Sequence, residues 1–193
     1  MDIQAEWSTA WCFCAALLCL ILPFSWIAAA VTAAVVHEVF HILAVLISGG
    51  RIYGIRIGIH GAVLYGSSLS VPRQLLSVLA GPMGSLLLIL TGRYVPQLAF
   101  CGFVQGIFNL LPLYPLDGGR VLRLVLENCM AQERAERICR WTDRTVIVAL
   151  IGLGFWASFV QKIGAGPVML SFLLVSGSGY GKISCKEGNL GVQ

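Results

Sequence analysis

Charged residues are scarce in this 193-residue chain, and their scarcity is the first feature that limits its fold. They make up 11% of the sequence, against about a quarter in soluble proteins, while 58% of the residues are hydrophobic. The chain also lacks a low-complexity tract, a repeat of fixed period and a linker long enough to separate two domains. These absences argue against a soluble multidomain protein and favour a single membrane-embedded domain over residues 1–193.

Long charge-free stretches predict the number of membrane-spanning helices, because a helix needs about 20 apolar residues to cross the hydrocarbon. Residues 7–50 contain one charged residue, Glu38, and are long enough for two spans with a turn at Pro23-Phe24-Ser25. We therefore expect an all-α polytopic membrane protein with about six transmembrane helices. The four further stretches are residues 74–92, 94–116, 145–161 and 163–181.

The basic residues predict the orientation of these spans, since lysine and arginine concentrate in cytoplasmic loops. With the N-terminus inside, loop 49–73 holds three arginines, loop 118–144 holds six, and the C-terminal tail holds two lysines. The opposite side receives only Arg93 and Lys162. We therefore expect both termini in the cytoplasm.

Two segments between the predicted spans have patterns of their own. In segment 51–65, isoleucines alternate with arginine, glycine and histidine, which is the period of a strand. We expect a small membrane-associated β-hairpin or sheet there, between the second and third spans, with its turn near Gly61. Segment 120–144 mixes ten charged residues with Leu, Val and Ile, and this predicts an amphipathic helical connection on the cytoplasmic face, solvated and without a partner of its own.

Only two acidic residues lie within or beside an apolar stretch, namely Glu38 inside a span and Asp117 at the edge of one. A charged side chain at the centre of a membrane helix costs about 2.5–3.5 kcal/mol, so such residues are usually partnered and functional. Glu38 belongs to His37-Glu38-Val39-Phe40-His41. Residues i and i+4 share one helix face, so His37 and His41 can present two imidazoles to one metal ion, with Glu38 beside them to accept a proton.

A catalytic zinc ion usually has three protein ligands and a water molecule, so a third ligand is needed. The remaining candidates are His60 and Asp117. His60 lies on the alternating strand segment, where a surface or packing role is the commoner one. Asp117 follows two prolines and precedes two glycines, so the span is broken there and can turn its carboxylate back toward the bundle interior. The alternative for Asp117 is a plain loop at the end of a span.

With these two motifs the chain resembles the site-2 protease family of intramembrane metalloproteases. It is similar to the compact bacterial type that processes membrane-bound sigma-factor precursors during sporulation. The family has an HExxH helix and a downstream Asn/Pro-rich segment that ends in Asp-Gly, and residues 37–41 and 109–118 match these motifs. Residues 79–82 are similar to the small-residue signature of the family, and the resemblance covers residues 26–128. The chain departs from the pattern in having Leu after Asn109.

The resemblance implies a zinc metalloendopeptidase that holds one Zn²⁺ per chain and hydrolyses a membrane-protein substrate at or within the bilayer, with release of a transcription regulator as one outcome. His37, His41 and Asp117 would bind the zinc, Glu38 would act as general base, and Asn109 would donate a hydrogen bond to the substrate backbone or the oxyanion. The expected location is a bacterial cell membrane. The expected partners are the substrate and the lipid bilayer, with a regulatory membrane partner left open and no nucleic acid.

Two other interpretations compete with this one. The first is a non-proteolytic membrane protein that binds or transports zinc, although transporters commonly show inverted repeats and the chain shows none. The second is a membrane zincin whose third ligand is a glutamate on a later helix. The glutamates available for that role lie in an arginine-rich loop, which is a poor place for a buried ligand; they are Glu127, Glu133 and Glu136.

Overall fold

The computed structural model of the chain describes residues 2–5, 23–50, 52–58, 61–66 and 69–160. The chain forms two compact units, residues 1–143 and residues 144–193. The described part of the first unit contains a three-stranded sheet, the helices α2 to α5 and the beginning of α6, and the described part of the second unit is the remainder of α6. The predicted first and last spans fall largely or wholly outside the described residues. Whether the two units form one domain stays a prediction.

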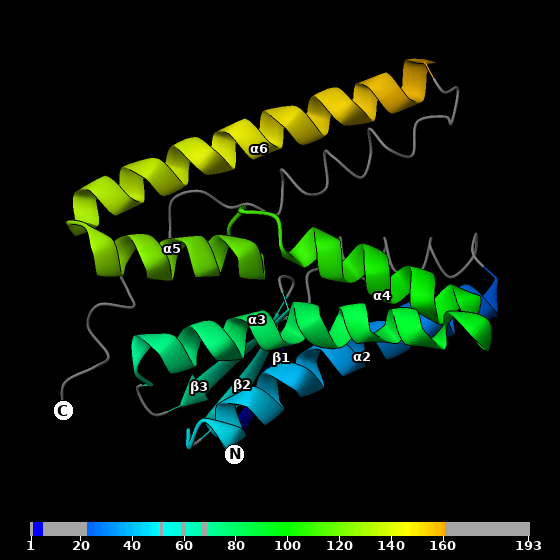
Figure 1. The fold of residues 1–193 in the computed structure, drawn as a ribbon, viewed down its shortest axis with the longest axis horizontal. Helices are drawn as coiled ribbons and strands as arrows, with labels where there is room; N and C mark the ends of the chain where they lie inside the picture. The colour runs from blue at the N-terminus through cyan, green and yellow to red at the C-terminus, as the bar shows by residue number, and fades with distance from the viewer. Residues whose placement is uncertain (1, 6–22, 51, 59–60, 67–68, 161–193) are drawn as a thin grey trace. The chain divides into compact units, whose positions relative to one another are not determined.

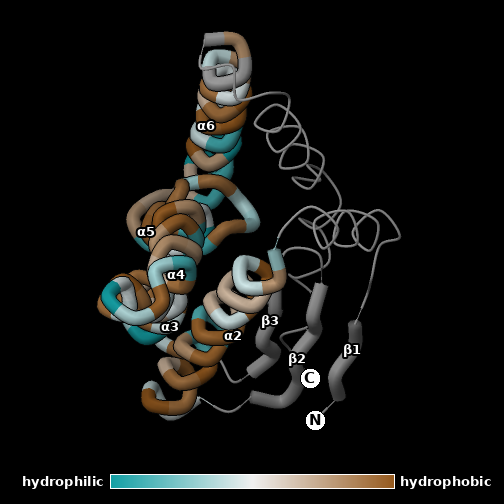
Figure 2. Tube along the Cα trace, turned by 90° about the vertical axis from the view of Figure 1, so that its right-hand side faces the viewer, coloured by the Kyte–Doolittle hydropathy of each residue, from teal (hydrophilic) through white to brown (hydrophobic). Residues whose placement is uncertain are grey.

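Helix α2 (Phe24–Ile47) carries its apolar surface on the outside. It begins directly after Pro23, where we expected a turn, and its 24 residues are enough to cross a bilayer. Its buried positions are small or polar and recur at intervals of one or two turns, whereas large aliphatic side chains face outward. This is the reverse of a soluble helix and suits a lipid solvent, and Figure 2 shows the hydrophobic colour along most of α2. The buried residues are Ala29, Ala33, His37 and Ala44, and exposed ones include Val31, Val35, Val39, Leu43 and Leu46.

Helix α3 (Val71–Leu87) continues into a short 3₁₀ helix, η1 (Leu88–Arg93). Proline at the second helical position suits the helix start, because the first amides have no partner within the helix. Residues 71–93 and α2 are two helices in the described part of the chain that are long and apolar enough to cross a membrane. The buried face of α3 consists of small residues, so that α2 and α3 pack closely; these residues are Ser77, Gly81, Pro82, Gly84 and Ser85.

Helix α4 (Pro96–Asn109) has 14 residues and ends before the two prolines at 112 and 115, so it is shorter than the span expected over 94–116. Figure 1 shows α2, α3 and α4 side by side, and these three helices contact one another. A loop over 110–116 then leads to α5 (Asp117–Cys129).

Our expectation of one helical connection over 120–144 followed by a separate span at 145–161 is wrong in its boundaries. Helix α5 ends at Cys129, the backbone of Met130 is extended, and a new helix, α6 (Gln132–Val160), runs for 29 residues without interruption at 144. The charged segment therefore divides between two helices. The second of these continues into the apolar segment, and Figure 2 shows hydrophilic residues among hydrophobic ones along α6.

The sheet contains β1 (Asp2–Ala5), β2 (Ile52–Gly58) and β3 (Gly61–Gly66), in that spatial order. Strands β2 and β3 are antiparallel, with Gly58 opposite Gly61 at the connection, and they occupy the segment whose residues alternate in the sequence. Strand β1 pairs with β2 in parallel. The N-terminal strand was not anticipated, because four residues are too few to display a period.

Candidate metal centre

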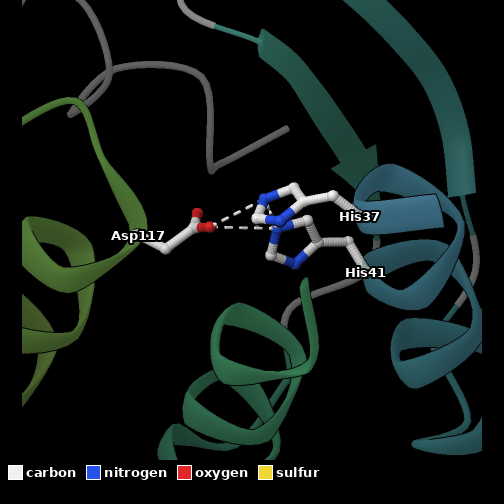
Figure 3. Close-up of side chains that lie close together, drawn as sticks. All are labelled: His37, His41 and Asp117. Carbon is white, nitrogen blue, oxygen red and sulfur yellow. Dashed lines mark hydrogen bonds and ion pairs between the residues drawn. The ribbon is translucent and has the colours of Figure 1, made fainter. Parts of the chain in front are cut away.

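Helix α2 places two imidazoles on one face, one turn apart. The Nε2 atoms of His37 and His41 are 3.1 Å from each other. His37 is buried, with 4% of its surface exposed, and His41 is partly buried. Figure 3 shows both rings pointing toward the first residue of α5. The i, i+4 spacing in the sequence therefore produces the paired imidazoles that it predicted.

The loop over 110–116 positions Asp117 beside these imidazoles. The amide of Leu116 donates to the carbonyl of Leu113 at 2.8 Å, and the amide of Tyr114 donates to Oδ1 of Asp143 at 3.0 Å. Asp143 is itself buried, so an acid that we assigned to a solvated connection instead fixes the loop.

Two glycines allow α5 to begin directly against this loop. A Cβ atom at Gly118 would collide with the backbone of Leu110 and Leu111, and one at Gly119 with the backbone of Leu113 and Tyr114. Backbone atoms cannot rotate away as side chains can, so these positions accept only glycine without movement of the loop. The sequence pair Gly-Gly after Asp117 is thus explained by close packing.

The carboxylate of Asp117 contacts both imidazoles. Its Oδ2 atom is 3.0 Å from Nε2 of His37 and 3.2 Å from Nε2 of His41. Asp117 lies beyond the predicted fourth span. Burial raises the pKa of its carboxyl, but the hydrogen bonds with His37 and His41 outweigh this effect and lower the pKa to about 2. The carboxylate is therefore ionised near neutral pH, which is the form that binds metals.

These three donor atoms fit a tetrahedral zinc ion. Zinc bonds to nitrogen and oxygen ligands are about 2.0–2.1 Å long, and tetrahedral geometry then separates neighbouring donors by about 3.3 Å. The three observed separations are 3.0, 3.1 and 3.2 Å. Two imidazoles and a carboxylate are also a ligand set that suits zinc better than magnesium or calcium.

The Nδ1 atoms of both imidazoles have partners on α3. Nδ1 of His41 is 2.7 Å from the backbone carbonyl of Ser77, and Nδ1 of His37 is 2.9 Å from the hydroxyl of Ser85. A carbonyl can only accept, so Nδ1 of His41 carries a proton, and in the neutral ring Nε2 then has the lone pair that a metal would take.

The other residues that we singled out lie as follows. Glu38 follows His37 on α2 and is partly buried. Asn109 is the last residue of α4, and its Nδ2 donates to the carbonyl of Gln105 at 3.1 Å, which leaves a second amide hydrogen. His60 lies outside the described residues. Glu127 and Glu136 pair with Arg123 and Arg140 and do not join the cluster.

Sequence reasoning missed the two serines and Asp143. The only signal for the serines was the small-residue run at 79–82, which marks a close helix contact but does not say which atoms meet. Asp143 carried no signal, because its segment contains many charged residues.

Comparisons with known proteins bear on this site. Residues 75–153 match the model of peptidase family M50, a range that includes Asp117 but not His37 and His41. Rip3 of Mycobacterium tuberculosis, whose name describes a zinc metalloprotease, is 30% identical over 157 residues, covering 71% of this chain and 40% of Rip3. The site-2 protease from Methanocaldococcus jannaschii has the same fold, with a TM-score of 0.62, 19% identity, and coverage of 84% of this chain and 81% of that one.

Within the described residues, two imidazoles one turn apart and a buried carboxylate form a group that could hold a metal ion. Over residues 75–153 the chain is similar to peptidase family M50, and its fold is that of a site-2 protease. The chain spans about 40% of the length of the curated relative it matches.

Gly81 is the position where added bulk should disturb the site most directly. A Cβ atom there would collide with the imidazole of His41. We expect Gly81→Ala to displace this ring, to destabilise the protein by about 1–3 kcal/mol, and to lower the zinc content of the purified protein. Metal analysis and a thermal unfolding curve check this.

Gly92→Ala is the matched control, because a Cβ atom at Gly92 meets Ala99 at an ordinary 3.5 Å. We expect it to keep the zinc content and stability of the wild type. Equal zinc content in the Gly81 variant and the wild type would contradict the tight contact with His41.

Proposed function

We propose that the chain is an intramembrane zinc metalloprotease that hydrolyses a peptide bond of a membrane-protein substrate at or within the bilayer. The observation that carries this proposal is the convergence of two imidazoles, one turn apart on α2, with a carboxylate 76 positions later in the chain. His37, His41 and Asp117 are the proposed zinc ligands. Release of a transcription regulator is the proposed outcome of cleavage.

Zinc, when bound, supplies Lewis acidity to the scissile carbonyl and to the attacking water. Glu38 accepts the proton of that water as general base and later delivers it to the leaving amine. Asn109 uses one amide hydrogen within α4, and its second hydrogen is the proposed donor to the substrate backbone or to the developing oxyanion.

The proposed arrangement in the membrane has six spans, with both termini and the arginine-rich loops in the cytoplasm of a bacterial cell. The apolar outward face of α2 supports a lipid environment for that helix, and the family supports membrane integration. Water must reach the zinc, so the site is proposed to open toward the cytoplasm, where the loop before Asp117 ends. A regulatory membrane partner would act on this opening.

The proposed substrate is unwound near the scissile bond and captured as an added strand. Strand β2 already has β1 on one side and β3 on the other. Among the described strands, the outer edges therefore belong to β1 and β3, and we propose the edge of β3 for the substrate.

Replacing residues 52–66 by a short Gly-Ser linker is expected to abolish cleavage while the zinc content stays at the wild-type level. The reason is that this change removes the strand edge and leaves α2 and Asp117 in place. Cleavage is measured in proteoliposomes and zinc by metal analysis. Full cleavage by the zinc-loaded variant would contradict strand capture.

The test of the function as a whole compares cells that produce the wild type with cells that produce Glu38→Gln. We expect new N-termini within or beside the apolar spans of one or more membrane proteins in the first cells only. A protein that binds zinc but generates no such termini would instead be a non-proteolytic zinc-binding membrane protein.

A further inference from the structure

Helix α3 presents two matched sites to the histidines of α2. Gly81 faces the ring of His41, and Ser85 faces His37. Gly81 and Ser85 are four residues apart on α3, as the two histidines are on α2. The later residue of α3 faces the earlier histidine, so one turn of α3 packs antiparallel against one turn of α2. Since Gly81 has no side chain, the ring of His41 lies where a Cβ atom would be and reaches the carbonyl of Ser77.

Ser85 is fully enclosed, with no exposed surface. A buried hydroxyl without a partner costs about 1–3 kcal/mol, and here its oxygen is 2.9 Å from Nδ1 of His37. When Nε2 of His37 donates its lone pair to a metal, the ring proton resides on Nδ1. In that tautomer Nδ1 donates to the oxygen of Ser85.

We propose that Ser85 is a positioning residue, whose hydroxyl holds the imidazole of His37 in the tautomer and orientation that direct Nε2 toward Asp117. This proposal rests on the proposed function, because it takes His37 as a zinc ligand. The imidazole of His41 is oriented in the same way by a backbone carbonyl, which a side-chain substitution does not remove. The two imidazoles therefore differ in how they are oriented, and only that of His37 depends on a side chain of α3.

Ser77 supplies an internal control. It is also buried on the same face of α3, but its hydroxyl donates to the carbonyl of Arg73 at 2.9 Å, and only its backbone contacts His41. Ser77→Ala and Ser85→Ala thus remove the same atom from the same helix face. Only the second change removes a hydrogen bond to an imidazole.

The experiment measures zinc affinity of the purified full chain by competition with a chromophoric chelator. Loss of a hydrogen bond to a metal-binding histidine typically weakens metal binding by about 10–100-fold, and we expect this for Ser85→Ala and wild-type affinity for Ser77→Ala. As a second readout, Co²⁺ is bound in place of Zn²⁺, and its visible absorption bands should shift in Ser85→Ala but not in Ser77→Ala.

A second pair of variants guards against a packing defect. Ser85→Thr and Ser85→Val have the same shape and differ only in the hydroxyl, so any strain from the extra methyl group is common to both. We expect the threonine variant to bind zinc more tightly than the valine variant. Equal affinities in this pair, or equal affinities for Ser85→Ala and Ser77→Ala, would overturn the role of Ser85.

Failure of this proposal is distinguishable from failure of the proposed function. If the wild-type chain binds about one zinc and Asp117→Ala loses it, the assignment of the metal centre stands, whatever the zinc affinity of Ser85→Ala. If the wild-type chain binds no zinc, both the assignment of the metal centre and the role of Ser85 are refuted.

Discussion

Replacing Glu38 by glutamine is expected to reduce peptide-bond hydrolysis by about 10²–10⁴-fold, which is the usual contribution of a general base. Glutamine has nearly the same shape but accepts no proton, so the zinc content should stay at the wild-type level. The rate is measured as the appearance of a cleavage fragment in proteoliposomes, and zinc is measured on the same preparation.

Glu133→Gln is the matched control, because Glu133 lies exposed in the first turn of α6. It should cleave at the wild-type rate. A Glu38→Gln protein that cleaves as fast as this control would refute the assignment of Glu38 as the base.

Replacing Asp117 by alanine is expected to remove zinc from the purified protein. The change deletes one of three proposed ligands. Loss of a side chain that only hydrogen-bonds to a ligand weakens metal binding by about 10–100-fold, and we expect a larger loss of zinc affinity here. Metal analysis of the wild type and the variant, prepared side by side, gives the result as zinc per chain.

Asp143→Asn is a matched control for Asp117→Ala, because Asp143 is also a buried aspartate and holds the loop through its Oδ1 atom. An asparagine oxygen at 143 can still accept from the amide of Tyr114. We expect this variant to keep its zinc. If Asp117→Ala also kept one zinc per chain, Asp117 would not be a ligand.

The sequence predicted those parts of the site that depend on local geometry. The spacing of His37 and His41 fixes their common face in any helix, and the prolines and glycines around Asp117 require a break in the chain there. The structure brings the three side chains together as expected. The start of α2 at Phe24 also follows from a local signal, since proline is poorly suited to a helix interior.

The parts that were missed depend on contacts between distant segments. No property of Ser85 or Asp143 in the sequence indicates that one contacts His37 and the other fixes the loop before Asp117. The end of α5 was missed for a different reason. The residues around Met130 include neither proline nor glycine, so nothing local marks the extended backbone at that point.

The distance along the chain between the two halves of the cluster has a consequence for the cell that makes this protein. His41 on α2 is synthesised 76 positions before Asp117 is added, and α2 by itself carries two histidines and a glutamate but no complete set of ligands. Under the proposed function, a growing polypeptide that has reached only α3 or α4 lacks the third proposed ligand and cannot yet hydrolyse its neighbours. The proposed hydrolysis would therefore require that synthesis has passed Asp117 and that the helices have assembled.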